Sequence, residues 1–277
     1  MPHAELPDAH LFYEVDGERG SPVVLIMGMG LGRGGWAPQI TALSPSHRVL
    51  TFDPCGIGAS TGRRAVYRIE RSAADVVALL DDAGFETAHV VGVSLGSLVA
   101  QEVALSHRGR VRSLTLLSAF SGARRLWLPS ARAFYWTPQV LLRRGWEQLF
   151  ALQRQLFSPE FLGRTDRRAL AEQMALHLAP GVPLPVAMAQ LAGILLYDSL
   201  PRLPQLAGLP VMLLHGGKDI LVPVARARRM AAAIPGARLH FCPTYAHGLT
   251  FEGAEEVNAL LLDHFHRADD ERDRQRM

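Results

Sequence analysis

Short apolar runs recur along this chain, separated by longer stretches in which apolar residues follow helical spacing. Runs of this length that are bounded by glycine or proline are typical of buried strands. Strands that alternate with helices form a parallel sheet, because the connection between parallel strands needs the length of a helix. The predicted strands span residues 10–15, 23–27, 48–53, 89–93, 111–119, 211–215 and 238–242.

The stretches between these strands supply the predicted helices. The clearest lies over residues 69–83, where Val76, Leu79 and Leu80 share one face and Gly84 provides a C-terminal stop. The sequence therefore predicts an α/β fold with a mostly parallel central sheet and helices on both faces. The other predicted helices span residues 95–106, 224–234 and 252–265.

The alternation of strands and helices stops between residues 121 and 205. This segment has irregularly spaced prolines and many aromatic residues but no convincing strand. We interpret it as a helical cap, residues 121–205, inserted into a core domain made of residues 1–120 and 206–266. Residues 267–277 are almost all charged and are expected to form a disordered tail.

Length and composition are those of an ordinary globular enzyme. The 277 residues are enough to bury a large core, and 48% of them are hydrophobic against 20% charged. No apolar run approaches the ~20 residues that a membrane-spanning helix needs. The first residues lack the basic and apolar segments of a signal peptide. We therefore expect a cytoplasmic protein that does not enter a membrane.

Charge and cysteine content favour a small-molecule enzyme. The net charge is +3, but the basic residues are spread along the chain and Lys218 is the only lysine, whereas nucleic-acid-binding proteins cluster their basic residues. Cys55 and Cys242 show no metal-ligand spacing and are expected to be reduced thiols. We expect a small-molecule substrate, no nucleic-acid partner, no metal and no cofactor. The oligomeric state stays open.

The most specific motif is GVSLG at residues 92–96, a G-x-S-x-G sequence between a predicted strand and a predicted helix. A serine at such a tight turn has strained backbone geometry, and small residues two positions away let strand and helix approach each other. The hydroxyl then projects from the sheet, and the helix N-terminus favours negative charge that develops beside it. Ser94 is therefore the candidate nucleophile.

A serine hydroxyl needs a general base and an acid that orients this base. Asp219 and His247 each follow the end of a predicted strand. Because the carboxyl ends of parallel strands meet at one edge of a sheet, we expect both side chains beside Ser94. Asp198 is a rival acid, but it follows no predicted strand. The chain order Ser94, Asp219, His247 is one of the orders known for catalytic triads.

One glycine-rich loop also matches a dinucleotide-binding pattern. Residues 30–35, GLGRGG, fit G-x-G-x-x-G, and Asp53 follows about 20 residues later. Trp36 and Pro38 leave little room for a helix packed closely on the preceding strand. A nucleotide site also does not explain the nucleophile elbow, which is the tight turn at Ser94, or the positions of Asp219 and His247. We therefore interpret these glycines as a flexible loop that shapes the surroundings of Ser94.

Over nearly its whole length the chain resembles the α/β-hydrolase family, in particular small bacterial esterases and 3-oxoadipate enol-lactonase-like members. The resemblance is carried by residues 27–30 (MGMG), residues 53–60 (DPCGIGAS), the elbow around Ser94 and the Asp219 and His247 segments. It implies that the backbone N–H groups of Met29 and Leu95 form the oxyanion hole. The chain departs from the family in having Met27-Gly28 where a histidine-glycine pair is usual.

The cap holds almost half of the aromatic residues of the chain. A cap over the carboxyl ends of the strands also roofs the pocket, so Trp127, Phe134 and Trp136 are the candidate substrate-binding residues. Packing between cap helices could account for the same aromatic residues. We expect a medium-sized, largely apolar acyl or lactone substrate. Several arginines of the cap are expected on its solvent face, although one could bind a substrate carboxylate: Arg124, Arg125, Arg143 and Arg144.

The expected reaction is hydrolysis of a carboxylic ester or lactone through an acyl-enzyme intermediate. His247 takes the proton of Ser94, Asp219 stabilises the imidazolium, and the two backbone N–H groups bind the oxyanion. A thioesterase, a C–C-bond hydrolase or a perhydrolase could use the same residues. A non-catalytic small-molecule binding protein with the same fold is the alternative from another class.

Overall fold

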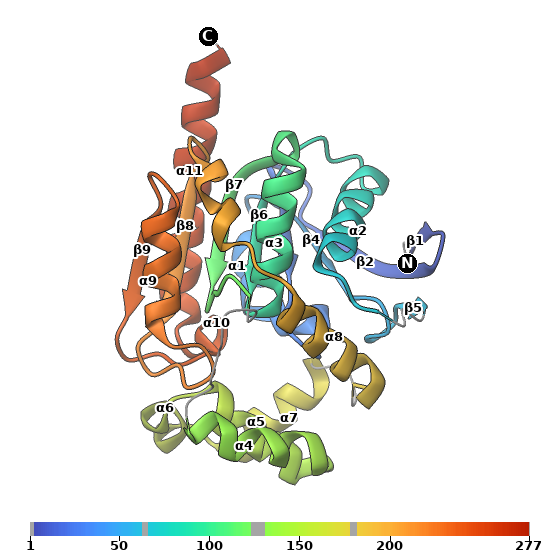
Figure 1. The fold of residues 1–277 in the computed structure, drawn as a ribbon, viewed down its shortest axis with the longest axis vertical. Helices are drawn as coiled ribbons and strands as arrows, with labels where there is room; N and C mark the ends of the chain where they lie inside the picture. The colour runs from blue at the N-terminus through green and yellow to red at the C-terminus, as the bar shows by residue number, and fades with distance from the viewer. Residues whose placement is uncertain (1–2, 63–65, 123–130, 178–181, 277) are drawn as a thin grey trace.

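The computed structural model describes residues 3–62, 66–122, 131–177 and 182–276. Its centre is a nine-stranded sheet in which the order is β1-β2-β4-β3-β6-β7-β8-β9, with β5 beside β2 (Figure 1). Every predicted strand is present with its ends shifted by one or two residues at most, and β1 and β5 are additional. The strands are β1 (His3–Leu6), β2 (Ala9–Asp16), β3 (Pro22–Ile26), β4 (Arg48–Phe52), β5 (Thr61–Gly62), β6 (Ala88–Val93), β7 (Val111–Leu117), β8 (Val211–Gly216) and β9 (Arg238–Cys242).

The sheet is parallel from β4 to β9 and antiparallel only at the edge formed by β1, β2 and β5. In β3, for example, Val24 pairs with Leu50 on one side and with Val90 on the other. All residues of β3 are buried, as expected for a parallel strand that is covered on both faces. The carboxyl ends of β3, β6, β7, β8 and β9 therefore meet at one edge.

Helices cover both faces of this sheet (Figure 1). The helices of the core are α1 (Ala37–Leu43), α2 (Ile69–Asp82), α3 (Leu95–Ser106), α9 (Val224–Ala233), α10 (Leu249–Glu252) and α11 (Ala254–Arg276), with the 3₁₀ helices η1 (Arg33–Trp36), η2 (Arg108–Arg110) and η3 (Leu200–Leu206). Leu79 of α2, Leu98 of α3 and Ala227 of α9 are fully buried in one core. Leu43 of α1 and Phe265 of α11 are fully buried in the second core, on the opposite face. The predicted α/β fold is confirmed.

In the described part of the chain, five α-helices between β7 and β8 form the segment predicted as the cap. They are α4 (Ala131–Leu142), α5 (Gly145–Leu156), α6 (Pro159–Arg164), α7 (Arg167–His177) and α8 (Leu184–Leu196). In Figure 1, α4 to α7 lie beyond the carboxyl ends of β7 and β9. Phe157, Leu170 and Met174 give these helices a small apolar core of their own. The described residues between β7 and β8 contain no strand, so this layer presents only helices to the edge where the strands end.

The loop after β3 differs from the sequence-based expectation, because it leads into a helix. η1 and α1 follow the glycine-rich segment directly. Pro38 lies in the first turn of α1, where its missing N–H has no partner within a helix in any case, so proline does not exclude a helix there. Trp36 is fully buried beneath this helix in the second core.

The charged C-terminal segment is helical, which corrects the expectation of a disordered tail. α11 continues to Arg276. Asp269 anchors it to the core, since its carboxylate accepts a hydrogen bond from Arg112 Nε at 2.8 Å and lies 3.2 Å from His89 Nε2. Arg267 adds a pair with Asp263 one turn earlier. Neither this helix nor any other described one combines the length and apolar character needed to cross a membrane.

Asp53 joins the two glycine-rich loops. Its Oδ1 accepts the backbone N–H of Arg33 at 2.8 Å, and its Oδ2 accepts that of Ala59 at 2.9 Å. Both carboxylate oxygens are thus bound by the backbone of this chain. The aspartate that completes the dinucleotide-binding pattern in the sequence therefore has a structural role, because it fixes the loop after β3 against the loop after β4.

Candidate active site

Ser94 occupies the turn between β6 and α3 with φ 54° and ψ −120°. A positive φ is costly for a residue with a Cβ and persists only where the surroundings impose it. Gly92 and Gly96 permit the turn: a Cβ at Gly96 would lie 2.1 Å from the carbonyl oxygen of Ile26, and one at Gly92 would lie 2.2 Å from that of Gly96. Ser94 is half-buried in this tight strand-turn-helix geometry.

The loop after β3 lies against Ser94. A Cβ on Gly28 would lie 3.3 Å from Ser94 Cβ and 3.9 Å from Ser94 Oγ, so the backbone of this loop passes directly beside the serine. Met29 follows Gly28. Leu95 is the first residue of α3, and an N–H in the first turn of a helix has no acceptor within the helix. The two residues predicted to supply the oxyanion hole thus flank Ser94.

Asp219 and His247 form a hydrogen-bonded pair. His247 Nδ1 lies 2.8 Å from Asp219 Oδ2, and the Asp219 side chain is fully buried. The other carboxylate oxygen accepts the backbone N–H groups of Leu221 and Val222, each at 2.8 Å. With a proton on Nδ1, a neutral His247 keeps a lone pair on Nε2. The imidazole is therefore oriented to accept a proton from a hydroxyl.

The end of β7 lies between the serine and the histidine. The backbone N–H of Ser94 donates to the carbonyl oxygen of Leu117 at 3.0 Å. Ser118, the next residue, donates its hydroxyl to the carbonyl oxygen of His247 at 2.9 Å. Consecutive residues at one strand end thus hold the elbow and the histidine turn, which brings the three residues predicted as a triad to the same edge of the sheet.

Glu252 ties the histidine turn to the cap. This buried carboxylate accepts the backbone N–H of Ala246 at 2.9 Å and that of Ser158 at 3.3 Å, and the hydroxyl of Ser158 also donates to it. The backbone N–H of Gly248 donates to the carbonyl oxygen of Leu156 at 2.7 Å. The end of α5 is therefore fixed beside His247, so the cap and the candidate base hold each other in position.

A second histidine lies beside Asp219. His215 is fully buried, and its Nε2 lies 2.9 Å from the carbonyl oxygen of Val222 and 3.7 Å from Asp219 Oδ2. Burial lowers the pKa of His215, against the opposing effect of the Asp219 charge, so this imidazole is neutral at pH 7. A neutral ring that donates from Nε2 to Val222 leaves the Asp219 carboxylate to His247.

Gln190 of α8 reaches from the cap to the loop of the predicted oxyanion hole. Its Oε1 accepts the backbone N–H of Gly30 at 2.9 Å, and Gln190 is only 1% exposed. Gly30 has φ 73°, a conformation that favours glycine. The glutamine therefore fixes the peptide group between Met29 and Gly30 and restrains the loop next to the Met29 N–H. No sequence pattern marks this contact, which joins residues 160 positions apart.

Replacing Gln190 with leucine is expected to lower kcat for a neutral ester about tenfold, with a smaller change in KM. Leucine has a similar volume but leaves the Gly30 N–H without its acceptor, at a cost of about 1–3 kcal/mol that shifts the loop. Steady-state kinetics would measure this. Met188→Leu on the exposed face of the same helix is the control and should retain wild-type kcat. Unchanged kcat in Gln190→Leu would show that the loop does not depend on this contact.

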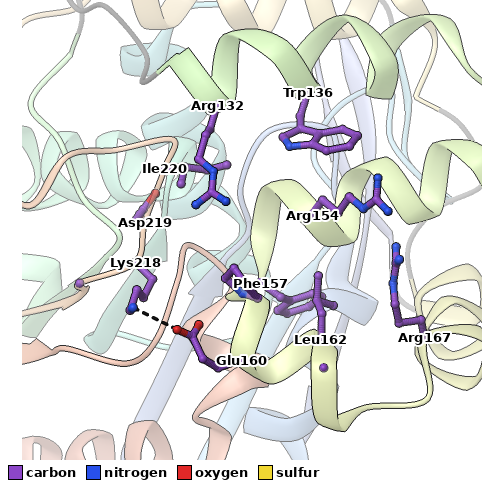
Figure 2. Close-up of a pocket in the computed structure, with 13 residues that line it drawn as sticks. Arg132, Trp136, Arg154, Phe157, Glu160, Leu162, Arg167, Lys218, Asp219 and Ile220 are labelled. Atoms are coloured by element: carbon purple, nitrogen blue, oxygen red, sulfur yellow. Dashed lines mark hydrogen bonds and ion pairs between the residues drawn. The ribbon is translucent and has the colours of Figure 1, made fainter.

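A pocket of about 680 Å³ lies between the cap and the loop that carries Asp219 (Figure 2). Trp136, one of the predicted substrate-binding residues, lines it together with Phe157. Trp127 and the side chain of Phe134 lie outside the described residues. Charged side chains also line the pocket, so it is less apolar than the sequence led us to expect. These charged residues are Arg132, Arg154, Glu160, Arg167 and Lys218.

Three potential metal ligands meet beside the edge strand β9. His240, Cys242 and Glu256 each offer one ligand atom, and these atoms lie within 4.8 Å of one another. His240 Nε2 lies 3.1 Å from a Glu256 oxygen. Burial raises the pKa of the Cys242 thiol to about 11, whereas metals bind the thiolate. The contact between His240 and Glu256 therefore explains why these two side chains lie together, and no ion is needed for it.

The chain is similar in sequence and in fold to proteins of known family. A family model described as alpha/beta hydrolase fold matches residues 21–254. A protein of Azorhizobium caulinodans that bears the name carbamate hydrolase RutD is 32% identical over 262 residues, which cover 95% of this chain and 97% of that protein. The solved structure of the enol-lactonase from Burkholderia xenovorans is similar with a TM-score of 0.81 at 26% identity, covering 96% of this chain and 100% of the other. A solved enzyme described as degrading N-acyl homoserine lactones is similar with a TM-score of 0.80 at 26% identity, covering 95% and 99%.

Proposed function

Since the chain belongs to the α/β-hydrolase fold family, we propose that it is a serine hydrolase that cleaves a carboxylic ester or lactone through an acyl-enzyme intermediate. The observation that carries this proposal is the pairing of His247 with a buried Asp219 at 2.8 Å, at the strand end that also holds the strained turn of Ser94. A hydroxyl, a base and an orienting acid at one sheet edge are the groups that acyl transfer needs.

In the acylation step, Ser94 Oγ attacks the carbonyl carbon while His247 Nε2 takes its proton. Asp219 stabilises the imidazolium and keeps Nδ1 protonated, so that Nε2 is the nitrogen that accepts. The N–H groups of Met29 and Leu95 bind the negative oxygen of the tetrahedral intermediate. The imidazolium then returns the proton to the leaving alkoxide, which departs as an alcohol, or stays tethered to the acyl group when the substrate is a lactone.

Water completes the reaction at the same site. His247 takes a proton from the water, whose oxygen attacks the acyl carbon, and the second tetrahedral intermediate uses the same two N–H groups. Collapse of this intermediate releases the carboxylic acid and returns the proton to Ser94. One ester bond and one water are thus consumed for each acid and each alcohol formed, with no cofactor.

A carbamate is a second candidate substrate, favoured by the name of the relative that is 32% identical over 95% of this chain. Its carbonyl would be attacked in the same way and would leave a carbamoyl group on Ser94. Thioester hydrolysis, C–C-bond hydrolysis and perhydrolysis use the same groups as well. The substrate therefore has to be established by experiment.

Quenched-flow turnover of a panel of p-nitrophenyl esters, lactones, aryl carbamates and thioesters would test the proposal, with intact-protein mass spectrometry of the quenched enzyme. The expected result is turnover of at least one ester or lactone and an acyl adduct on the peptide that contains Ser94. Turnover without an adduct at Ser94 would refute the proposed acyl-enzyme intermediate. Labelling of Ser94 by a fluorophosphonate without turnover of any compound would favour a binding protein.

A further inference from the structure

Four cationic side chains line the pocket between the cap and the Asp219 loop, against a single accessible carboxylate. The cations are Arg132, Arg154, Arg167 and Lys218, and the carboxylate is Glu160. The side chain of Asp219 is fully buried and pairs with His247, so it does not neutralise the pocket. This space therefore carries an excess of positive charge.

Arg167 is held in place by its neighbours in the cap. Its Nε donates to Gln153 Oε1 at 3.1 Å, its Nη2 donates to the carbonyl oxygen of Phe150 at 3.3 Å, and its guanidinium lies 5.1 Å from the centre of the Phe150 ring. These bonds use two of the five N–H donors of the guanidinium and bring no negative charge. Burial and the nearby charge of Arg154 lower the pKa of Arg167, as expected for like charges that face one space.

The other cations leave room for an anion. Arg154 lies 4.8 Å from the centre of the Trp136 ring, and Figure 2 shows Arg132 pointing from α4 into the pocket. In the part of the chain that the structure describes, no carboxylate forms an ion pair with Arg154 or Arg167, whereas the charge of Arg132 acts on Glu160 and helps to lower the pKa of this carboxyl. Lys218 pairs with Glu160 at 3.1 Å, but both side chains are well exposed, and such surface pairs are weak.

The pocket borders both loops of the candidate active site. Lys218 and Ile220, which flank Asp219, belong to its lining. Phe157, also in the lining, contacts Gly248, because a Cβ on this glycine would lie 2.7 Å from the phenylalanine ring. Gly248 directly follows His247. A molecule that fills the pocket therefore ends beside the histidine turn.

We propose that this pocket binds a carboxylate at the end of the substrate remote from the scissile carbonyl. A guanidinium binds a carboxylate through two parallel charge-assisted hydrogen bonds, while Trp136, Phe157 and Leu162 offer an apolar wall to the chain between carboxylate and ester. The substrate class is thus a monoester of a dicarboxylic acid. This inference rests on the proposed function, since it assumes that the carbonyl is attacked by Ser94.

Matched p-nitrophenyl esters provide the test: butyrate against hemisuccinate, hexanoate against hemiadipate, and octanoate against hemisuberate. In each pair a terminal carboxylate replaces a methyl group. For at least one chain length, kcat/KM is expected to favour the charged ester by at least about tenfold, the size of effect that a charge-assisted hydrogen bond supports. This preference should decrease as NaCl is raised.

Arg154→Gln should remove most of this preference by raising KM for the charged ester, because the contact is remote from the reacting bond. The readout is the ratio of kcat/KM for the charged ester to kcat/KM for its neutral partner, which should fall towards one. Arg154→Lys, which keeps the charge but not the planar pair of donors, should be intermediate. Arg168→Gln is the matched control, because this arginine of α7 is 77% exposed and does not line the pocket; it should leave both esters unaffected.

Two results would separate the failure of this inference from the failure of the proposed function. Turnover of neutral esters at every length, with no preference for the charged partner, would overturn the carboxylate site and leave the hydrolase standing. If no ester is turned over, titration calorimetry of the wild type and of Arg154→Gln with succinate, adipate and suberate decides. Binding of a diacid that is lost in Arg154→Gln would support the site, and equal binding by the two proteins would overturn it.

Discussion

Replacing Ser94 with alanine is expected to lower kcat for ester hydrolysis by roughly 10³- to 10⁶-fold, because removal of the nucleophile leaves only substrate binding and the oxyanion donors. The substitution deletes one oxygen from a half-buried side chain. The turn itself is held by the hydrogen bond from the Ser94 N–H to Leu117 and by the close packing of Gly96 against Ile26, and alanine keeps both. The fold and the melting temperature should therefore be preserved.

Steady-state kinetics with the best ester of the panel would measure this loss, with circular dichroism as the check on folding. Ser106→Ala at the opposite end of α3 is the control, since Ser106 contacts Glu102 and Arg202 rather than the site; it should turn over ester like the wild type. If Ser94→Ala kept more than about a tenth of wild-type kcat, Ser94 would have no part in covalent catalysis.

The sheet and the three clustered polar residues could be predicted because each leaves a local signal. A buried parallel strand is a continuous apolar run, as in β3 and β8. The turn at Ser94 needs small residues on both sides, because a Cβ at Gly92 or Gly96 would lie 2.2 or 2.1 Å from a backbone oxygen. Asp219 and His247 follow strands whose carboxyl ends share an edge, so their proximity follows from topology.

The residues that hold this site in position left no such signal. Gln190, Glu252 and Ser118 act through hydrogen bonds to residues 160, 94 and 129 positions away in the chain. A buried glutamine or glutamate can be explained only when its partner is known. The helicity of the charged C-terminal segment depends likewise on Asp269, whose partners Arg112 and His89 come from strands β7 and β6.

The arginines that line the pocket are not the ones that the sequence analysis named. Arg143 and Arg144 are exposed, as the sequence led us to expect, and Arg124 and Arg125 lie outside the described residues. The arginines that line the pocket are Arg132, Arg154 and Arg167. Which arginines face the core depends on how α4, α5 and α7 pack against one another, and a weak amphipathic pattern does not determine this.

Replacing Asp219 with asparagine is expected to lower kcat by about 10⁴-fold while preserving the fold. The amide oxygen of asparagine can still accept the N–H groups of Leu221 and Val222, which hold the loop at 2.8 Å each. The amide NH₂ would then face His247 Nδ1, where the carboxylate oxygen now lies at 2.8 Å. Because this NH₂ donates, the imidazole must accept at Nδ1 and carry its proton on Nε2, where it can no longer take a proton from Ser94.

Three measurements would check this expectation. Kinetics should show the loss in kcat, the melting temperature should stay close to that of the wild type, and ¹⁵N NMR of the histidine side chains should show that the proton of His247 has moved from Nδ1 to Nε2. Asp198→Asn is the control: Asp198 is the other acid that the sequence offered, and its carboxylate accepts the backbone N–H of Leu200 at 3.1 Å at the end of the cap. Near-normal kcat in Asp219→Asn would show that His247 does not need Asp219 as an orienting acid. A comparable loss of kcat in Asp198→Asn would show that the role had been assigned to the wrong aspartate.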